Sequence, residues 1–129
     1  MVDVSAAVIV RDGKILICQR PEGKGNALLW EFPGGKRERG ETPEECLVRE
    51  CLEELGVTVS VHEMLGEREH TYPDITVHLR FFRASLSSGE PTRREHRDMR
   101  WVRPEELSSY AFCPADKEFV THLETMDWG

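Results

Sequence analysis

The chain lacks an apolar run long enough to cross a bilayer: the longest near its start is AAVIV, at residues 6–10. A membrane-spanning helix needs about 20 such residues, and no signal-peptide pattern precedes this stretch. The sequence also lacks a CxxC pair. Its four cysteines, at positions 18, 46, 51 and 113, predict reduced thiols in a cytoplasmic protein rather than a disulfide framework.

An excess of basic residues is absent as well, since 17 Lys and Arg face 24 Asp and Glu for a net charge of −7. This balance argues against a nucleic-acid polymer or an anionic membrane as partner. A small phosphorylated ligand stays compatible with it if a cation or local arginines offset the repulsion. No repeat, linker or biased tract divides the 129 residues, so one domain over residues 1–129 is expected.

Alternating and apolar segments predict most of the strands. VSAAVIV and KILICQR flank RDG, which predicts a hairpin over residues 4–20 that turns at Asp12 and Gly13. Further strands are expected at 28–32, 57–65, 67–72, 75–82 and 98–102, and helices at 104–107 and 115–126. The glycine-rich, charged stretch 33–41 is expected to be irregular. This order of elements favours a mixed sheet with helices on its faces.

Residues 42–55 carry a full set of helix signals. Thr42 is a capping residue, Pro43 suits the first turn, and Glu45 completes a Thr-x-x-Glu capping box. Gly56 is typical of the residue that ends a helix. An apolar stripe between these ends is expected to pack on the sheet, and its members are Leu47, Val48, Cys51, Leu52 and Leu55.

Three glutamates crowd the C-terminal half of this helix. Glu50, Glu53 and Glu54 fall at i, i+3 and i+4, roughly opposite the apolar stripe. Each like-charged pair costs about 0.2–0.5 kcal/mol, and the negative end of the helix dipole adds to that cost. Two interpretations fit: a solvated acidic face relieved by Arg49, or a site for a hard divalent cation, which prefers carboxylate oxygens.

The loop before the helix decides between these interpretations. Gly35, five residues, Glu41, seven residues and then RECLEELGV at 49–57 match the pattern G-x5-E-x7-R-E-U-x-E-E-x-G-U, in which U is apolar. Every fixed residue is present, and a chance match at ordinary residue frequencies is on the order of one in 10⁸ per position. This pattern, at residues 35–57, is the Nudix box, so the chain resembles the Nudix hydrolase family.

Other segments resemble the MutT-type branch of that family. They are LLWEFPGGK before the box, YPD after it, Glu95 six residues before Trp101, and PAD at 114–116. The resemblance implies an α/β/α sandwich, of α/β (α+β) class, around a mixed, partly antiparallel sheet. It also implies a small-molecule nucleotide substrate and a Mg²⁺ cofactor, with Mn²⁺ as an alternative. The sequence leaves monomer and homodimer open.

The resemblance assigns the chemistry to the box and its surroundings. Glu50 is interpreted as the base that takes a proton from the attacking water, with Glu53 or Glu95 as alternates. Arg49 and Glu41 are interpreted as residues that hold the loop and the carboxylates in place; the alternative for Arg49 is an ordinary i,i+4 pair. The implied metal ligands are the carbonyl of Gly34 and the carboxylates of Glu50, Glu53, Glu54 and Glu95.

The resemblance also implies a substrate site. Arg20 stands where the family reaches the substrate phosphate; the alternative is a strand-end surface arginine. Lys36, Arg37 and Arg39 are better explained as solvated loop charge. Asp116 either reads the base as an ionised carboxylate that only accepts hydrogen bonds, or caps the last helix. The implied substrate-binding residues are Arg20, Glu31, Phe32, Pro33, Gly34, Tyr72, Asp74 and Asp116.

The implied activity is a Mg²⁺-dependent nucleoside triphosphate pyrophosphohydrolase that releases a monophosphate and pyrophosphate. Sanitising oxidised nucleotides such as 8-oxo-dGTP is slightly favoured, and CTP or dCTP is the alternative substrate. A rival interpretation is a Nudix-fold module that senses a nucleotide without cleaving it. Such modules normally lose part of the glutamate set, whereas this chain keeps all of it.

Overall fold

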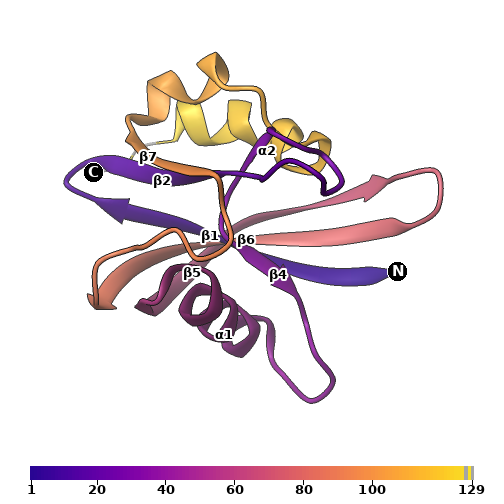
Figure 1. Ribbon diagram of the computed structural model, residues 1–129, viewed down its shortest axis with the longest axis horizontal. Helices are drawn as coiled ribbons and strands as arrows, with labels where there is room; N and C mark the ends of the chain where they lie inside the picture. Colours follow the sequence, from indigo (N-terminus) through magenta and orange to yellow (C-terminus); the bar gives the residue numbers. More distant parts are fainter. Residues whose placement is uncertain (127, 129) are drawn as a thin grey trace.

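The computed structural model describes residues 1–126 and 128 (Figure 1). None of the helices in this part of the chain is long and apolar enough to span a membrane. The elements in chain order are β1 (Val2–Arg11), β2 (Lys14–Gln19), β3 (Trp30–Glu31), β4 (Gly34–Lys36), α1 (Pro43–Leu55), β5 (Thr58–Thr71), β6 (Thr76–Ser88), β7 (Asp98–Val102), the 3₁₀ helix η1 (Pro104–Ser109) and α2 (Pro114–Thr125).

A mixed seven-stranded sheet forms the centre of the molecule. Its strand order is β3-β2-β1-β6-β5, with β4 added to β1 and β7 added to β2. Strand β1 is parallel to β6 but antiparallel to β2 and β4, which confirms the expected mixed, partly antiparallel sheet. Asp12 and Gly13 join β1 to β2 with φ angles of 52° and 75°, as a tight hairpin turn requires.

Helices cover both faces of this sheet. Ile9 of β1 packs with Leu47 of α1 on one face, whereas the neighbouring Val8 packs with Phe119 of α2 on the other. Figure 1 shows α1 below the sheet, and α2 above it. Because both faces are covered, consecutive residues of β1 and β2 are buried instead of alternating with exposed ones. The expected α/β/α sandwich is confirmed.

The signals predicted for α1 are confirmed at both ends. The Thr42 side chain accepts from the N–H of Glu45 at 3.1 Å, Glu45 accepts from the N–H of Thr42 at 2.8 Å, and Gly56 ends the helix with a φ of 70°. The prediction for Leu52 is wrong, because this side chain is 51% exposed. Cys46, which is fully buried, belongs to the inward face in its place, since α1 packs on β1, β4 and β5.

The prediction that residues 33–41 are irregular is wrong for β4. Gly34–Lys36 pairs with Val4–Ala6 of β1. A Cβ atom on Gly34 would lie 2.0 Å from the carbonyl oxygen of Ser5, so the missing side chain is what lets the two strands approach. The strand expected at 28–32 also shortens to Trp30–Glu31, because Leu28 takes a positive φ of 64° in the preceding loop.

Candidate active site

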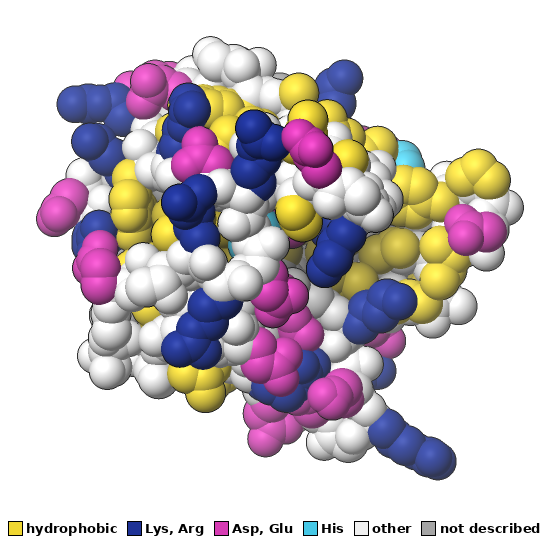
Figure 2. Space-filling model, viewed as in Figure 1, with side chains coloured by type: hydrophobic (Ala, Val, Ile, Leu, Met, Phe, Trp, Pro, Cys, Tyr) yellow, Lys and Arg dark blue, Asp and Glu magenta, His cyan; other side chains and the backbone are white. Residues whose placement is uncertain are grey.

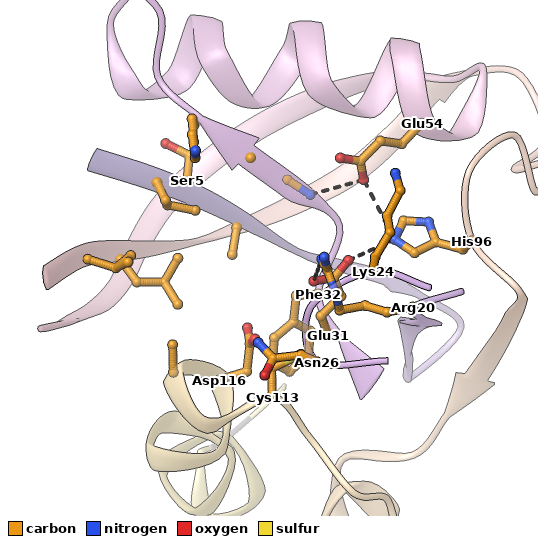
Figure 3. Close-up of a pocket in the computed structure, with 18 of the residues that line it drawn as sticks. Ser5, Arg20, Lys24, Asn26, Glu31, Phe32, Glu54, His96, Cys113 and Asp116 are labelled. Carbon is orange, nitrogen blue, oxygen red and sulfur yellow. Dashed lines mark hydrogen bonds and ion pairs between the residues drawn. The ribbon is translucent and has the colours of Figure 1, made fainter. Parts of the chain in front are cut away.

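A cavity of about 290 Å³ opens between α1, the short strands β3 and β4, and the start of α2. Figure 3 shows side chains from distant parts of the sequence pointing into it. Six of the residues predicted for the substrate site line it, together with two of the predicted carboxylate ligands. These eight residues are Arg20, Glu31, Phe32, Gly34, Tyr72, Asp116, Glu54 and Glu95.

Glu54 is the carboxylate that α1 turns into this cavity. Its side chain is 11% exposed, and its Oε1 accepts only a long hydrogen bond, of 3.4 Å, from the N–H of Gly34. Burial, and then the nearby carboxylates of Glu50 and Glu31, raise the pKa of Glu54 to about 10. A buried carboxyl with so little compensation is suited to a cation that is supplied from outside the chain.

The three glutamates of α1 do not share one exposed face, so that part of the prediction is wrong. Glu53 is 55% exposed, whereas Glu54 lies at the edge of the inward face and is buried. Glu50 lies against β4, where a Cβ atom on Gly35 would come within 2.5 Å of its carboxyl group. Two carboxylates of the helix therefore pack directly over the glycine backbone of β4.

Arg49 ties the loop before α1 to the carboxylates of the helix. Its guanidinium donates to Glu41 at 2.6 and 3.1 Å, to Glu50 at 2.9 Å, to Glu53 at 3.2 Å, and to the carbonyl of Lys36 at 3.0 Å. These acceptors, Glu41 first, hold the pKa of Arg49 well above its ordinary value. The contact is therefore more than an i,i+4 pair, because it connects the loop before α1 to the helix.

Acidic side chains gather low in the view of Figure 2, with Lys and Arg among and around them, whereas higher in the view Lys and Arg are interspersed with Asp and Glu. Arg20 lines the cavity; its Nη1 donates to Glu31 at 3.1 Å and its Nε to the carbonyl of Gly25 at 2.7 Å. A guanidinium held in this way faces the cavity and does not extend freely into solvent.

Asp116 belongs to the cavity and does not cap α2. The helix begins at Pro114 with Cys113 at its N-cap, so the capping alternative is wrong. Full burial, and then the charge of Glu31, raise the pKa of the Asp116 carboxyl well above its ordinary value. Burial therefore favours the protonated carboxyl, which both donates and accepts, over the ionised, accept-only form that was expected.

Some predicted residues lie away from the cavity. Pro33 is buried, its carbonyl accepts from the N–H of Ala7 at 2.8 Å, and it does not line the cavity. Asp74 is exposed in the turn between β5 and β6 and does not line the cavity. Lys36 lines the cavity edge, whereas Arg37 pairs with Asp3 at 2.9 Å.

Several lining residues received no role from the sequence. His96 directly follows Glu95, so its place beside a predicted ligand was the signal that could have found it. Lys24 and Asn26 lie in the polar, glycine-bearing loop that follows Arg20, where a substrate-facing loop was a reasonable expectation. Only the fold brings in the polar Ser5 and Cys113 and several apolar side chains, which are Val4, Ala6, Pro21, Val77, Leu79 and Ala115.

The donors around Glu54 suit a hard divalent cation such as Mg²⁺. The predicted ligand set offers oxygen atoms alone, from one backbone carbonyl and four carboxylates, as this ion prefers. Within residues 1–126 and 128, no three His, Cys, Asp or Glu side chains converge into a ready ligand cluster. Glu50 and Glu53 each accept from Arg49 through one carboxylate oxygen in this structure.

The raised pKa of Glu54 predicts how the stability of the metal-free protein depends on pH. Because this pKa lies above its ordinary 4.5, the folded chain binds the proton more tightly than the unfolded chain between about pH 4.5 and 10. Glu54 therefore destabilises the fold increasingly as the pH rises through that window. In EDTA at about pH 8, we expect Glu54→Gln to raise the melting temperature by roughly 3 °C or more.

The same substitution should change the melting temperature little at about pH 4.5, where the unfolded chain also binds the proton. Glu44→Gln, at an exposed site in the first turn of α1, is the matched control and should show no such pH dependence. A Glu54→Gln protein no more stable than the wild type at pH 8 would contradict the buried, uncompensated state of this carboxyl.

Comparisons with known proteins agree with this geometry. The NUDIX domain profile matches residues 5–122. The CTP pyrophosphohydrolase of Escherichia coli is 40% identical, over 90% of this chain and 86% of its own length. The 8-oxo-dGTP diphosphatase of Haemophilus influenzae is 35% identical, over 95% and 91%. The solution structure of the E. coli ORF135 protein superposes with a TM-score of 0.82 at 38% identity, covering 94% of this chain and 86% of that one.

Proposed function

The chain belongs to the NUDIX domain family of hydrolases, and from that premise we propose that it is a Mg²⁺-dependent nucleoside triphosphate pyrophosphohydrolase. Water cleaves one phosphoric anhydride bond, and a nucleoside monophosphate and pyrophosphate leave. The observation that carries the proposal is the buried Glu54, with a pKa raised to about 10, beside a cavity lined by Arg20. Such perturbed carboxyls in a cavity are typical of functional sites.

The proposed ligands of the cation are the Gly34 carbonyl and the carboxylates of Glu50, Glu53, Glu54 and Glu95. When bound there, Mg²⁺, or Mn²⁺ in its place, supplies neutralisation of the phosphate oxygens and a more acidic water. Glu50 accepts the proton of the attacking water. Arg49, through Glu41 and the carbonyl of Lys36, keeps Glu50 at its place over β4. Arg20 binds a phosphate of the substrate.

The base of the nucleotide is proposed to lie between Phe32, Tyr72 and Asp116. Aromatic rings stack on nucleobases, and Asp116 in the protonated form that burial favours offers one donor and one acceptor to the base edge. Relatives named for 8-oxo-dGTP and for CTP both support such a site. We favour 8-oxo-dGTP and keep CTP or dCTP as the second candidate. Initial rates on 8-oxo-dGTP, dGTP, CTP and dCTP, measured as pyrophosphate released, distinguish the two.

The state of Asp116 has a measurable consequence for base reading. Asp116→Asn keeps one donor and one acceptor, so we expect kcat/KM for the preferred nucleotide to fall by less than about tenfold. Asp116→Leu removes both and leaves the base unpaired, which costs about 1–3 kcal/mol. That variant should therefore lose roughly ten- to a hundredfold in kcat/KM, at about 1.4 kcal/mol per tenfold. Equal losses of kcat/KM in the two variants would contradict the proposal that a protonated Asp116 both donates to the base and accepts from it.

The net charge and the cysteines support a proposed class of substrate and a proposed cellular location. Free nucleotides rather than nucleic-acid polymers are its substrates, since the net charge is −7. A cytoplasmic location is supported by the four cysteines, which are all free thiols and buried. The whole of residues 1–129 is proposed to form one Nudix hydrolase domain, because the profile already spans residues 5–122.

A further inference from the structure

His96 is a buried residue that lines the cavity, and the proposed reaction assigns it no role. Its side chain is 4% exposed, and Nε2 lies 2.9 Å from Oε2 of Glu31 and 3.9 Å from Oε1 of Glu54. Its Nδ1 has no hydrogen-bond partner among the described residues. Figure 3 shows the ring beside both carboxylates, which come from β3 and α1.

The main chain fixes where this ring sits. The segment before β7 is attached to the end of α1, because the N–H of Thr92 donates to the carbonyl of Leu55 at 2.9 Å. It is also attached to the end of β2, because the N–H of Arg97 donates to the carbonyl of Gln19 at 2.9 Å. His96 lies between these two anchors, so its ring is delivered to the place where Glu31 and Arg20 meet.

The hydrogen bonds run from His96 through Glu31 to Arg20. Oε2 of Glu31 is held by Nε2 of His96, and Oε1 of Glu31 accepts from Nη1 of Arg20 at 3.1 Å. Each carboxylate oxygen thus has one partner. Without the histidine, the Glu31 carboxylate is free to rotate, and the guanidinium that it orients loses its fixed direction into the cavity.

The two ring nitrogens have different surroundings. Nε2 faces oxygen atoms of two carboxyl groups, a setting that favours the tautomer with a hydrogen on Nε2. Nδ1 is buried without a partner in the described part of the chain. What the site uses is therefore one N–H at the far end of a flat side chain. Glutamine can place an N–H near the same point, whereas phenylalanine fills the space but donates nothing.

We propose that His96 is a positioning residue for substrate binding, which holds Glu31 so that Glu31 aims Arg20 at a phosphate of the nucleotide. The proposal rests on the proposed function for the identity of the ligand. It assigns no proton transfer to His96, and it predicts that the histidine acts on affinity rather than on the chemical step.

Steady-state kinetics of His96→Phe and His96→Gln test this proposal. We expect His96→Phe to raise KM for the nucleotide by about tenfold or more while kcat stays within about threefold, because Arg20 binds the ground state and the transition state alike. His96→Gln should recover most of the affinity. His62→Phe, an exposed histidine on β5 outside the cavity, is the matched control and should behave as the wild type.

A double-mutant cycle distinguishes positioning from a separate structural effect. If His96 acts through Arg20, then His96→Phe should change KM by less than about threefold in an Arg20→Ala background, although it changes KM strongly in the wild type. Full additivity with Arg20→Ala, a loss confined to kcat, or wild-type kinetics for His96→Phe would each overturn the proposal.

Two readouts keep the test independent of turnover and of the folding of a variant. Proton-coupled ¹⁵N spectra of the wild-type protein should show a hydrogen on Nε2 of His96, and a bare Nε2 would overturn the proposal. Calorimetry with a non-hydrolysable nucleoside triphosphate analogue should rank the wild type and the His96 variants by Kd in the same order as by KM. A wild-type protein that binds the nucleotide and never cleaves it would overturn the proposed function while leaving this ranking to decide the role of His96.

Discussion

Glu53→Gln and Glu54→Gln are each expected to lower kcat by about two orders of magnitude or more at saturating Mg²⁺. Both substitutions keep size and shape but remove an anionic oxygen that the proposed cation needs. A loss of this size corresponds to about 2.7 kcal/mol of transition-state stabilisation, at about 1.36 kcal/mol per tenfold, and several kcal/mol is what such a cation supplies. The measurement is pyrophosphate release over a range of Mg²⁺ concentrations.

The fold should survive both substitutions, because each one relieves repulsion between like charges on α1. Glu44→Gln makes the same chemical change on an exposed residue of the first turn of α1 and should keep wild-type turnover. Wild-type kcat in either Glu53→Gln or Glu54→Gln would remove that residue from the metal site, and full activity of the wild type in EDTA would remove the metal itself.

Arg49→Lys should lower kcat by roughly ten- to a hundredfold, the size of effect seen when a residue that orients metal ligands is lost. Lysine keeps the charge but cannot reach Glu41 through two nitrogens and Glu50 through a third, as the guanidinium does. The Mg²⁺ concentration for half-maximal rate should rise, because the Glu50 carboxylate is then held less firmly over β4.

The control for Arg49 is Arg83→Lys, which alters an exposed ion pair with Glu63, and neither residue lines the cavity. It should leave kcat and the Mg²⁺ dependence unchanged. If Arg49→Lys matched that control, the contacts of Arg49 would be a surface pair of little consequence. If Arg49→Lys unfolded the chain, circular dichroism would show the loss of secondary structure. Glu41→Gln would then replace it in the kinetic comparison.

The features that the sequence predicted well depend on residues close together along the chain. The ends of α1 follow from Thr42, Glu45 and Gly56, whose capping contacts span a few residues each. The contact of Glu41 with Arg49 also lies within one loop and the helix after it. Local geometry of this kind is written into residue type and spacing, so the loop and helix that carry the carboxylates could be predicted.

What the sequence could not predict depends on contacts between distant segments. Gly34 looked like a loop residue because its close approach to Ser5 of β1 is visible only in the folded chain. Burial of Glu54 follows from packing of α1 on β4, and the role of His96 from a segment that bridges α1 and β2. Burial, which no local pattern reports, likewise raises the pKa of the Asp116 carboxyl.

The most direct measurement is the product analysis of a single reaction. Purified protein is incubated in ¹⁸O-labelled water with 8-oxo-dGTP and, separately, with CTP, in the presence of either Mg²⁺ or EDTA. The products are then separated and their masses are measured by mass spectrometry. We predict nucleoside monophosphate and pyrophosphate, with one ¹⁸O incorporated, in Mg²⁺ and no product in EDTA. Orthophosphate with a nucleoside diphosphate as primary products, or tight nucleotide binding without any cleavage, would contradict a metal-dependent pyrophosphohydrolase.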